Sequence, residues 1–326
     1  MKKRNLLLGI YLPIVFVLTG VAVAFRTVAA MTSLNPVTGY YTDKTFLTAA
    51  SWIAVAAVIF GASYLIFGDK KLKLVASFDT PATYIPSAVV AVALLFMSAG
   101  MIRDAIGSMG GYITADTLRA NALPLITAAL ALLAIAGFFL TSFSDRREDL
   151  VRAAFGIATV VFILAYEAML YFDGSMPKNA PDRIVDLLAY VSASVFFLHE
   201  IRLSLGRDVW IAYIAFGMTG AALCAYSSIP ALIVYFADGG TISNSIYETV
   251  LTFALFIFMT CRVLITTVLA EDKDTPLVKI IKLSEEHRHT SDENSEDISS
   301  GKDSEDVANY TFDLSAGGGE NKGEDR

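Results

Sequence analysis

Eight long stretches of apolar residues, separated by short polar segments, occupy the first 270 residues of the chain. Each is about twenty residues long, the length that an α-helix needs to cross a hydrocarbon core of about 30 Å. None shows alternating polarity in segments of about ten residues, which is typical of a membrane β-barrel. The pattern predicts an all-α, polytopic membrane protein with a transmembrane helical bundle over residues 1–270. The expected spans are residues 6–26, 46–67, 84–103, 121–143, 150–173, 183–204, 209–236 and 246–269.

Composition agrees with this pattern and locates the net charge. The chain is 55% hydrophobic and only 17% charged, whereas soluble domains carry about 25% charged residues. Residues 271–326 hold sixteen acidic and seven basic side chains. Residues 1–270 hold sixteen acidic and eighteen basic side chains. The net charge of −7 therefore belongs to the C-terminal part and does not indicate a nucleic-acid partner. The partner that the bundle requires is the lipid bilayer.

Two different segments follow the last span. Residues 271–290 mix leucines and isoleucines with lysines, so they predict an amphipathic segment on the inner membrane surface. Residues 291–326 lack the apolar side chains needed to fold and predict a disordered acidic cytoplasmic tail. Within this tail Tyr310, Phe312 and Leu314 alternate, as in an extended peptide that adds to the sheet edge of a partner. They are candidate contacts for a cytoplasmic protein partner, and simple disorder is the other interpretation.

Lysines and arginines in the short loops predict the orientation. Eleven lie on the side that holds the N-terminus, and six, which include Arg26 and Arg183, lie in the loops of the other side. Because positive loops remain in the cytoplasm, we expect both termini there and the bundle in the cell membrane. The leader MKKRN also fits a signal peptide, but the apolar run from Leu6 to Phe25 exceeds the 7–15 residues of a signal core. An uncleaved first helix is therefore favoured.

The two predicted external loops near the start of the chain have different characters. Residues 27–45 contain an Asn-Pro turn and the pair Tyr40 and Tyr41, whose rings fit the aromatic belt at a membrane interface. Residues 104–120 contain several glycines without the Lys-Ser/Thr ending of a phosphate-binding loop. We interpret this second loop as a flexible connection.

Polar side chains at membrane depth are costly and are therefore candidates for function. Glu167 lies about 9 Å outward from the centre of its span at 1.5 Å per residue, and several hydroxyl residues share this height. Pro230 removes a backbone donor beside them. These residues predict a polar cavity in the outer half of the bundle, on a substrate or proton pathway. The candidates are Glu167, Tyr190, Tyr226, Ser227, Ser228 and Pro230.

A structural role is the alternative for the same residues. Hydroxyl groups commonly hold transmembrane helices together, and burial can keep a glutamate protonated. Asp186, Glu248 and Arg103 fall near the outer interface, where we expect water to solvate them.

In the inner half, Glu200 and Arg262 have about the same depth, roughly 8 and 7 Å below the midplane. A buried arginine needs a partner or must extend to the interface. We therefore expect Glu200 and Arg262 to form an intramembrane ion pair with His199 adjacent, and the alternative is that Arg262 alone reaches the interface.

The sequence offers little support for catalysis or for a cofactor. His199 and Glu200 begin an HExxH pattern, but Leu203 stands where the second zinc-binding histidine would be. The two cysteines, Cys224 and Cys261, lie inside spans without a CxxC neighbour and fit small apolar fillers. We expect no metal and no cofactor.

Three functions remain, in order of preference. The first is a permease-like transporter of a small solute or ion that uses the outer polar cavity. The second is a non-enzymatic scaffold or regulatory subunit that recruits a partner through its acidic tail. The third, an enzyme acting on lipid, lacks a visible catalytic cluster. Homo-oligomerisation is left open by the sequence.

Overall fold

The computed structural model describes residues 3–35, 40–68, 81–110, 114–143, 150–172, 177, 179–205, 207, 209–238 and 245–269. Within these residues, eight helices are long and apolar enough to cross a membrane. The prediction of an all-α polytopic bundle is confirmed, and the chain is a multi-pass membrane protein. The predicted segment 271–290, the tail 291–326 and its candidates Tyr310, Phe312 and Leu314 lie outside the described residues.

The described part of the chain contains nine helices and one short β-hairpin. The helices are α1 (Lys3–Ser33), α2 (Thr45–Phe67), α3 (Pro81–Ser108), α4 (Ala115–Ala120), α5 (Ala122–Phe143), α6 (Leu150–Phe172), α7 (Pro181–Ser204), α8 (Trp210–Asp238) and α9 (Ile246–Leu269). The strands are β1 (Leu34–Asn35) and β2 (Tyr40–Tyr41), which pair in antiparallel fashion with Leu34 opposite Tyr41. All helices except α4 are candidate spans.

The helix ends differ from the expected spans mainly at two places. α1 continues to Ser33 instead of ending near residue 26, and Thr27 and Ser33 donate to the carbonyls of Val23 and Ala29 one turn earlier. The loop 104–120 is also more ordered than expected. α3 reaches Ser108, and Thr114 begins α4 with a capping box that involves Thr117, because a threonine hydroxyl can satisfy the free amides of a first turn.

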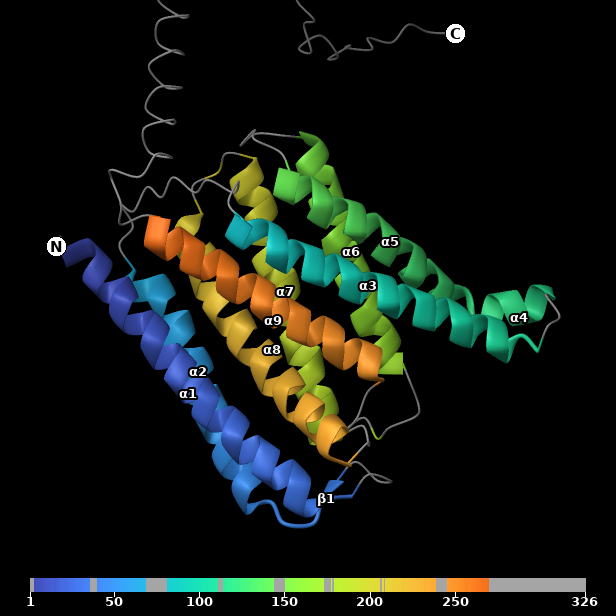
Figure 1. Ribbon diagram of the computed structural model, residues 1–326, viewed down its shortest axis with the longest axis horizontal. Coiled ribbons are helices and arrows are strands. Elements are labelled where there is room, and N and C mark those ends of the chain that lie inside the picture. The colour runs from blue at the N-terminus through green and yellow to red at the C-terminus, as the bar shows by residue number, and fades with distance from the viewer. Residues whose placement is uncertain are drawn as a thin grey trace, which may run out of the picture. The chain divides into compact units, whose positions relative to one another are not determined.

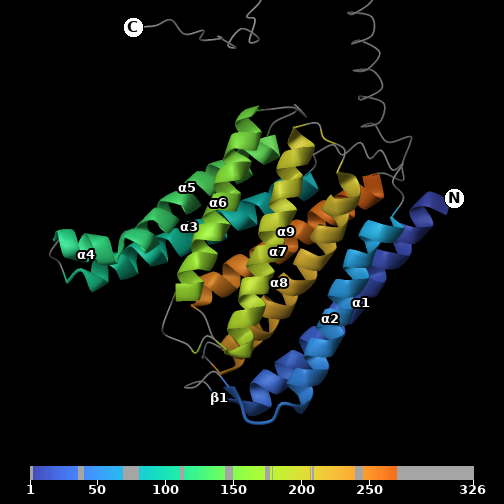
Figure 2. The same ribbon diagram turned by 180° about the vertical axis from the view of Figure 1, so that it is seen from behind.

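The helices form a closed ring with an attached pair. α3, α5, α6, α7, α8 and α9 pack in this order, and α9 returns to α3. α1 and α2 pack against each other and against α8, outside the ring, and both ribbon views show them side by side along one flank (Figures 1 and 2). We call α1 and α2 with the intervening strands β1 and β2 the hairpin unit. The end of the bundle that holds β1 is called the β1 end.

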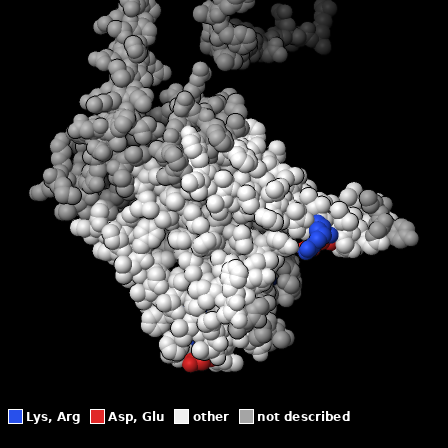
Figure 3. Space-filling view, in the orientation of Figure 1, with Lys and Arg blue, Asp and Glu red and all other residues white. Residues whose placement is uncertain are grey.

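The surface and the core are both largely apolar. In the space-filling view, charged atoms of the described residues gather only at two margins (Figure 3). Exposed large side chains include Trp52 of α2 and Phe236 of α8, which suits a surface in contact with lipid. The arrangement leaves the ring interior and the contact between the hairpin unit and the ring as the places where buried polar side chains can meet.

Candidate functional site

The first buried polar group is an ion pair at the β1 end. Arg26 of α1 donates from Nη2 to Oδ1 of Asp182, in the first turn of α7, at 2.5 Å, and the two side chains are 2% and 1% exposed. Tyr41 of β2 donates its hydroxyl to the same carboxylate at 3.0 Å. Arg26 also donates to the carbonyl of Tyr226 in α8, and its guanidinium lies 4.6 Å from the centre of that ring. We call Arg26, Tyr41, Asp182 and Tyr226 the Arg26 cluster.

Asp186 extends this cluster into the ring. It lies one turn beyond Asp182 on α7, is buried, and accepts a hydrogen bond from Ser227 of α8. Tyr190 lies one further turn along α7. Residues four apart on a helix share one face, so α7 presents both carboxylates to the same region.

Two further hydrogen bonds continue the polar region across the ring. Tyr166 of α6 donates to Glu248 of α9, and the hydroxyls of Tyr190 and Thr252 are 2.9 Å apart. The rings of Tyr166 and Tyr190 meet edge to face, with centroids 5.1 Å apart. We call the Arg26 cluster, the Asp186–Ser227 pair and these two hydrogen-bonded pairs together the polar layer. Its members are Arg26, Tyr41, Tyr166, Asp182, Asp186, Tyr190, Tyr226, Ser227, Glu248 and Thr252.

An aromatic cluster fills the ring on the side of the polar layer that is away from the β1 end. The ring of Phe138 in α5 lies 5.5 Å from that of Phe197 in α7 and 5.3 Å from that of Phe258 in α9. Phe196 packs edge to face on Phe197 at 5.4 Å. Edge-to-face contacts at these distances are favourable. The cluster closes the middle of the ring in this structure.

The second ion pair lies beyond the aromatic cluster. Arg262 Nη2 of α9 is 3.0 Å from Glu200 Oε1 of α7, and the side chains are 1% and 10% exposed. The structure thus brings together the two residues that share a predicted depth. His199 is on another face of α7, because its Nδ1 is 2.8 Å from the Val195 carbonyl and its ring stacks on Phe216 of α8.

The structure separates the outer-half candidates. Tyr190, Tyr226 and Ser227 belong to the polar layer, whereas Ser228 donates to the Cys224 carbonyl of its own helix at 2.7 Å. Glu167 is half-buried on α6, and its buried Oε1 accepts no hydrogen bond from any described residue. Pro230 lies inside α8, which continues to Asp238.

Sequence reasoning missed the Arg26 cluster. The sequence pattern places Arg26 in an external loop, Tyr41 in the aromatic belt at a membrane interface and Asp186 in water. In the structure all three side chains are buried. The reason is that α1 and β2 lie against the start of α7, where Asp182 neutralises Arg26. The i, i+4 spacing of Asp182 and Asp186 opposite an arginine at the end of a span was the available signal.

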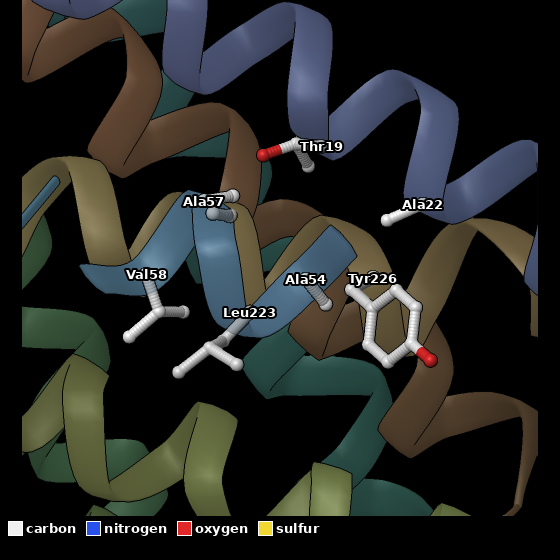
Figure 4. Close-up of a pocket in the computed structure, with 8 residues that line it drawn as sticks. Thr19, Ala22, Ala54, Ala57, Val58, Leu223 and Tyr226 are labelled. Carbon is white, nitrogen blue, oxygen red and sulfur yellow. The ribbon is translucent and has the colours of Figure 1, made fainter. Parts of the chain in front are cut away.

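A small pocket lies beside the Arg26 cluster, between α1, α2 and α8 (Figure 4). It is lined mainly by alanines and other apolar side chains, with Thr19 and Tyr226 as its polar members. It has no room for a water molecule, and neither Glu167 nor Tyr190 lines it. Across the described ranges, no three His, Cys, Asp or Glu side chains gather as a metal-ligand set.

No known protein family, no curated protein and no solved structure matches this chain. The chemistry of the buried side chains is therefore the basis for a functional conclusion.

Proposed function

We propose that the protein is a permease-like transporter of a small solute or ion, and that the polar layer is its binding and proton-transfer region. The observation that carries the proposal is the gathering of hydrogen-bonded ionisable and hydroxyl side chains from α1, α6, α7, α8 and α9 inside an apolar bundle.

The energetic cost of this layer supports a functional role. Taking an ionised side chain out of water carries a desolvation cost, and Arg26, Asp182 and Asp186 are all buried. Replacing a buried ion pair with well-packed apolar residues is often neutral or stabilising. Stability alone thus gives little reason to bury Asp182 beside Arg26 and to add a second carboxylate, Asp186, one turn away.

The aromatic cluster supports a permease in preference to an open channel. Phe138, Phe197 and Phe258 pack in the ring between the polar layer and the Glu200–Arg262 pair. A solute that reached the polar layer would need a conformational change to pass this cluster. Transport by movement of one helical unit against another meets that requirement.

Proton flux into proteoliposomes tests the proposal. Purified protein is reconstituted with an internal pH-sensitive dye, and a potassium diffusion potential, negative inside, drives protons inward. We expect faster acidification than in protein-free vesicles, and at least about a tenfold loss with Asp186→Asn, which keeps the shape of the side chain but cannot carry the charge. Glu167→Gln tests whether the carboxyl of Glu167, which lies outside the polar layer, also carries protons. Asp104→Asn is the matched control, because Asp104 belongs to an exposed ion pair.

A proton leak that is independent of Asp186 would contradict the assigned role of the layer. If neither protons nor sodium ions, tested in the same vesicles, move faster than in protein-free vesicles, the proposal of an ion-coupled transporter fails.

The acidic tail supports the alternative of a scaffold or regulatory subunit, through the alternating residues Tyr310, Phe312 and Leu314. Deleting residues 291–326 separates the two functions. A transporter keeps its flux without the tail, whereas a scaffold loses its cytoplasmic partner in a pull-down with the full-length chain.

A further inference from the structure

The hairpin unit packs on the ring mainly through α8. α1 and α2 pack on each other and on α8, and the ring closes through α3 and α9 without them. Figures 1 and 2 show the pair lying along one flank of the bundle. Displacing it would leave all six helix–helix contacts of the ring intact.

Part of the contact between the hairpin unit and α8 is made by small side chains. Ala22 of α1, Ala54 and Ala57 of α2 and Leu223 of α8 line the apolar pocket (Figure 4). Ala222 of α8 also lines it. Small apolar surfaces offer little area and few dispersion contacts to hold a helix in one position. This contact therefore opposes movement less than the aromatic packing inside the ring.

Directional bonds between the hairpin unit and the ring gather in the Arg26 cluster. α1 is not packed against α7, yet Arg26 reaches Asp182 there, and Tyr41 reaches the same carboxylate. Arg26 also holds the Tyr226 carbonyl of α8. Breaking these bonds would leave the packing of α1 and α2 on α8 as the main contact that holds the hairpin unit to the ring.

We propose that the Arg26 cluster is the latch of a gate: when the Arg26–Asp182 pair separates, the hairpin unit moves away from α8 and opens the polar layer to the aqueous phase at the β1 end. This inference rests on the proposed transport function, for which the gate supplies the access step. The polar layer is closed at its other side by the aromatic cluster, so an open latch would give access from one side of the membrane only.

Accessibility of a single thiol tests the latch. Ala222→Cys, in a chain with Cys224→Ala and Cys261→Ala, places one thiol on the α8 wall of the pocket. The latch is removed by Arg26→Met, Asp182→Leu and Tyr41→Phe together, because replacing a buried pair with apolar side chains spares the fold an unpaired charge. A membrane-impermeant methanethiosulfonate reagent is added to each side of proteoliposomes in turn.

A second single-thiol chain serves as the matched control. It retains only Cys224, which is buried in the ring where α8 meets α7, with its thiol 3.9 Å from the Ala189 carbonyl. This thiol does not face the hairpin unit, so opening of the gate should leave its reaction rate unchanged, whereas general unfolding should raise it.

The expected result is a modification rate at residue 222 that rises at least about tenfold in the latch variant, from one side only, while the rate at Cys224 stays constant. A tenfold change corresponds to ~1.4 kcal/mol lost from the closed state. An unchanged rate at residue 222, or an equal rise at both thiols, would overturn the latch. The assay requires no transport. A faster modification at residue 222 in a protein without ion flux would therefore reject the proposed function alone. Ion flux without faster modification at residue 222 would reject the latch alone.

Discussion

At the scale of single residues, the unusual feature is that the carboxylates differ strongly in burial and in bonding partners. Asp104 forms an exposed ion pair with its neighbour Arg103, whereas Asp182 and Asp186 are buried and bonded to α1, β2 and α8. Exposed pairs contribute about 0–1 kcal/mol to stability. The buried carboxylates are therefore where substitutions will reveal function, and the exposed ones serve as controls.

A fourth carboxylate, Asp43, gives a prediction about acid stability. The backbone N–H and the hydroxyl of Thr45 donate to Asp43 at 2.9 and 2.8 Å, which lowers the pKa of this exposed carboxyl below its ordinary value. A lowered pKa stabilises the folded state above the unfolded pKa, and this contribution is lost as the pH falls through the folded pKa.

We expect Asp43→Ala to lower the melting temperature at pH ~7 and to have less effect at pH ~3, on the two sides of the ordinary Asp pKa of ~3.9. Thermal unfolding in detergent measures the difference. Asp43→Asn keeps an acceptor for Thr45 and should retain more stability than Asp43→Ala. A difference that does not depend on pH would show that the negative charge of Asp43 is not involved.

At the scale of the elements, close approach of α8 to α7 and α9 depends on glycine. A Cβ atom at Gly217 would meet Val263 of α9 and would lie 3.1 Å from Cε2 of Phe196 in α7. Gly217→Ala should therefore lower the free energy of unfolding by roughly 1–3 kcal/mol through overpacking.

Gly20→Ala is the control for Gly217→Ala, because nothing lies within 4 Å of a Cβ at this position of α1. It should be neutral or stabilise by up to about 1 kcal/mol through helix propensity. Unfolding in mixed micelles measures both, and equal effects would contradict the close packing of α8.

The Glu200–Arg262 pair provides a prediction about two elements together. Each single reversal, Glu200→Arg or Arg262→Glu, leaves two like charges buried and should cost about 3–5 kcal/mol or more. The double reversal restores opposite charges and should recover part of the protein level and melting temperature. A double variant no better than the single variants would show that the pair does not stabilise the α7–α9 contact.

At the scale of the whole molecule, membrane orientation can be predicted from the charges of the loops. Arg26 and Arg183 were counted as charges of the external loops, but both are buried within helices. Without these two arginines, the loops on the predicted cytoplasmic side hold eleven Lys and Arg residues and those on the other side hold four, in place of six. This strengthens the expectation that the β1 end faces away from the cytoplasm.

Reporter fusions measure this orientation. A fluorescent protein fused after Leu269 should be active in the cytoplasm of bacterial host cells, and alkaline phosphatase fused after Gly110 should be active outside it. No fluorescence from the fusion after Leu269, together with no phosphatase activity from the fusion after Gly110, would invert the assignment and would place the latch on the cytoplasmic side.

The sequence by itself determined the spans and the depths of their polar residues. The hydrocarbon core fixes how many apolar residues a helix needs, so α2, α5 and α9 begin and end within a residue of their predicted limits. The constant rise per residue placed Glu200 and Arg262 at one height, and the structure places them 3.0 Å apart. These properties depend only on positions along one helix.

The tertiary structure decided which helices are neighbours and which way each side chain faces. Membrane helices are apolar towards lipid and towards the core, so their pattern does not indicate rotation: in α2 Ala50 is buried and Trp52 exposed, although both are apolar. The Arg26–Asp182 pair joins side chains 156 positions apart. It forms because the hairpin unit packs on α8 beside the start of α7, a result of long-range side-chain complementarity that no local spacing contains.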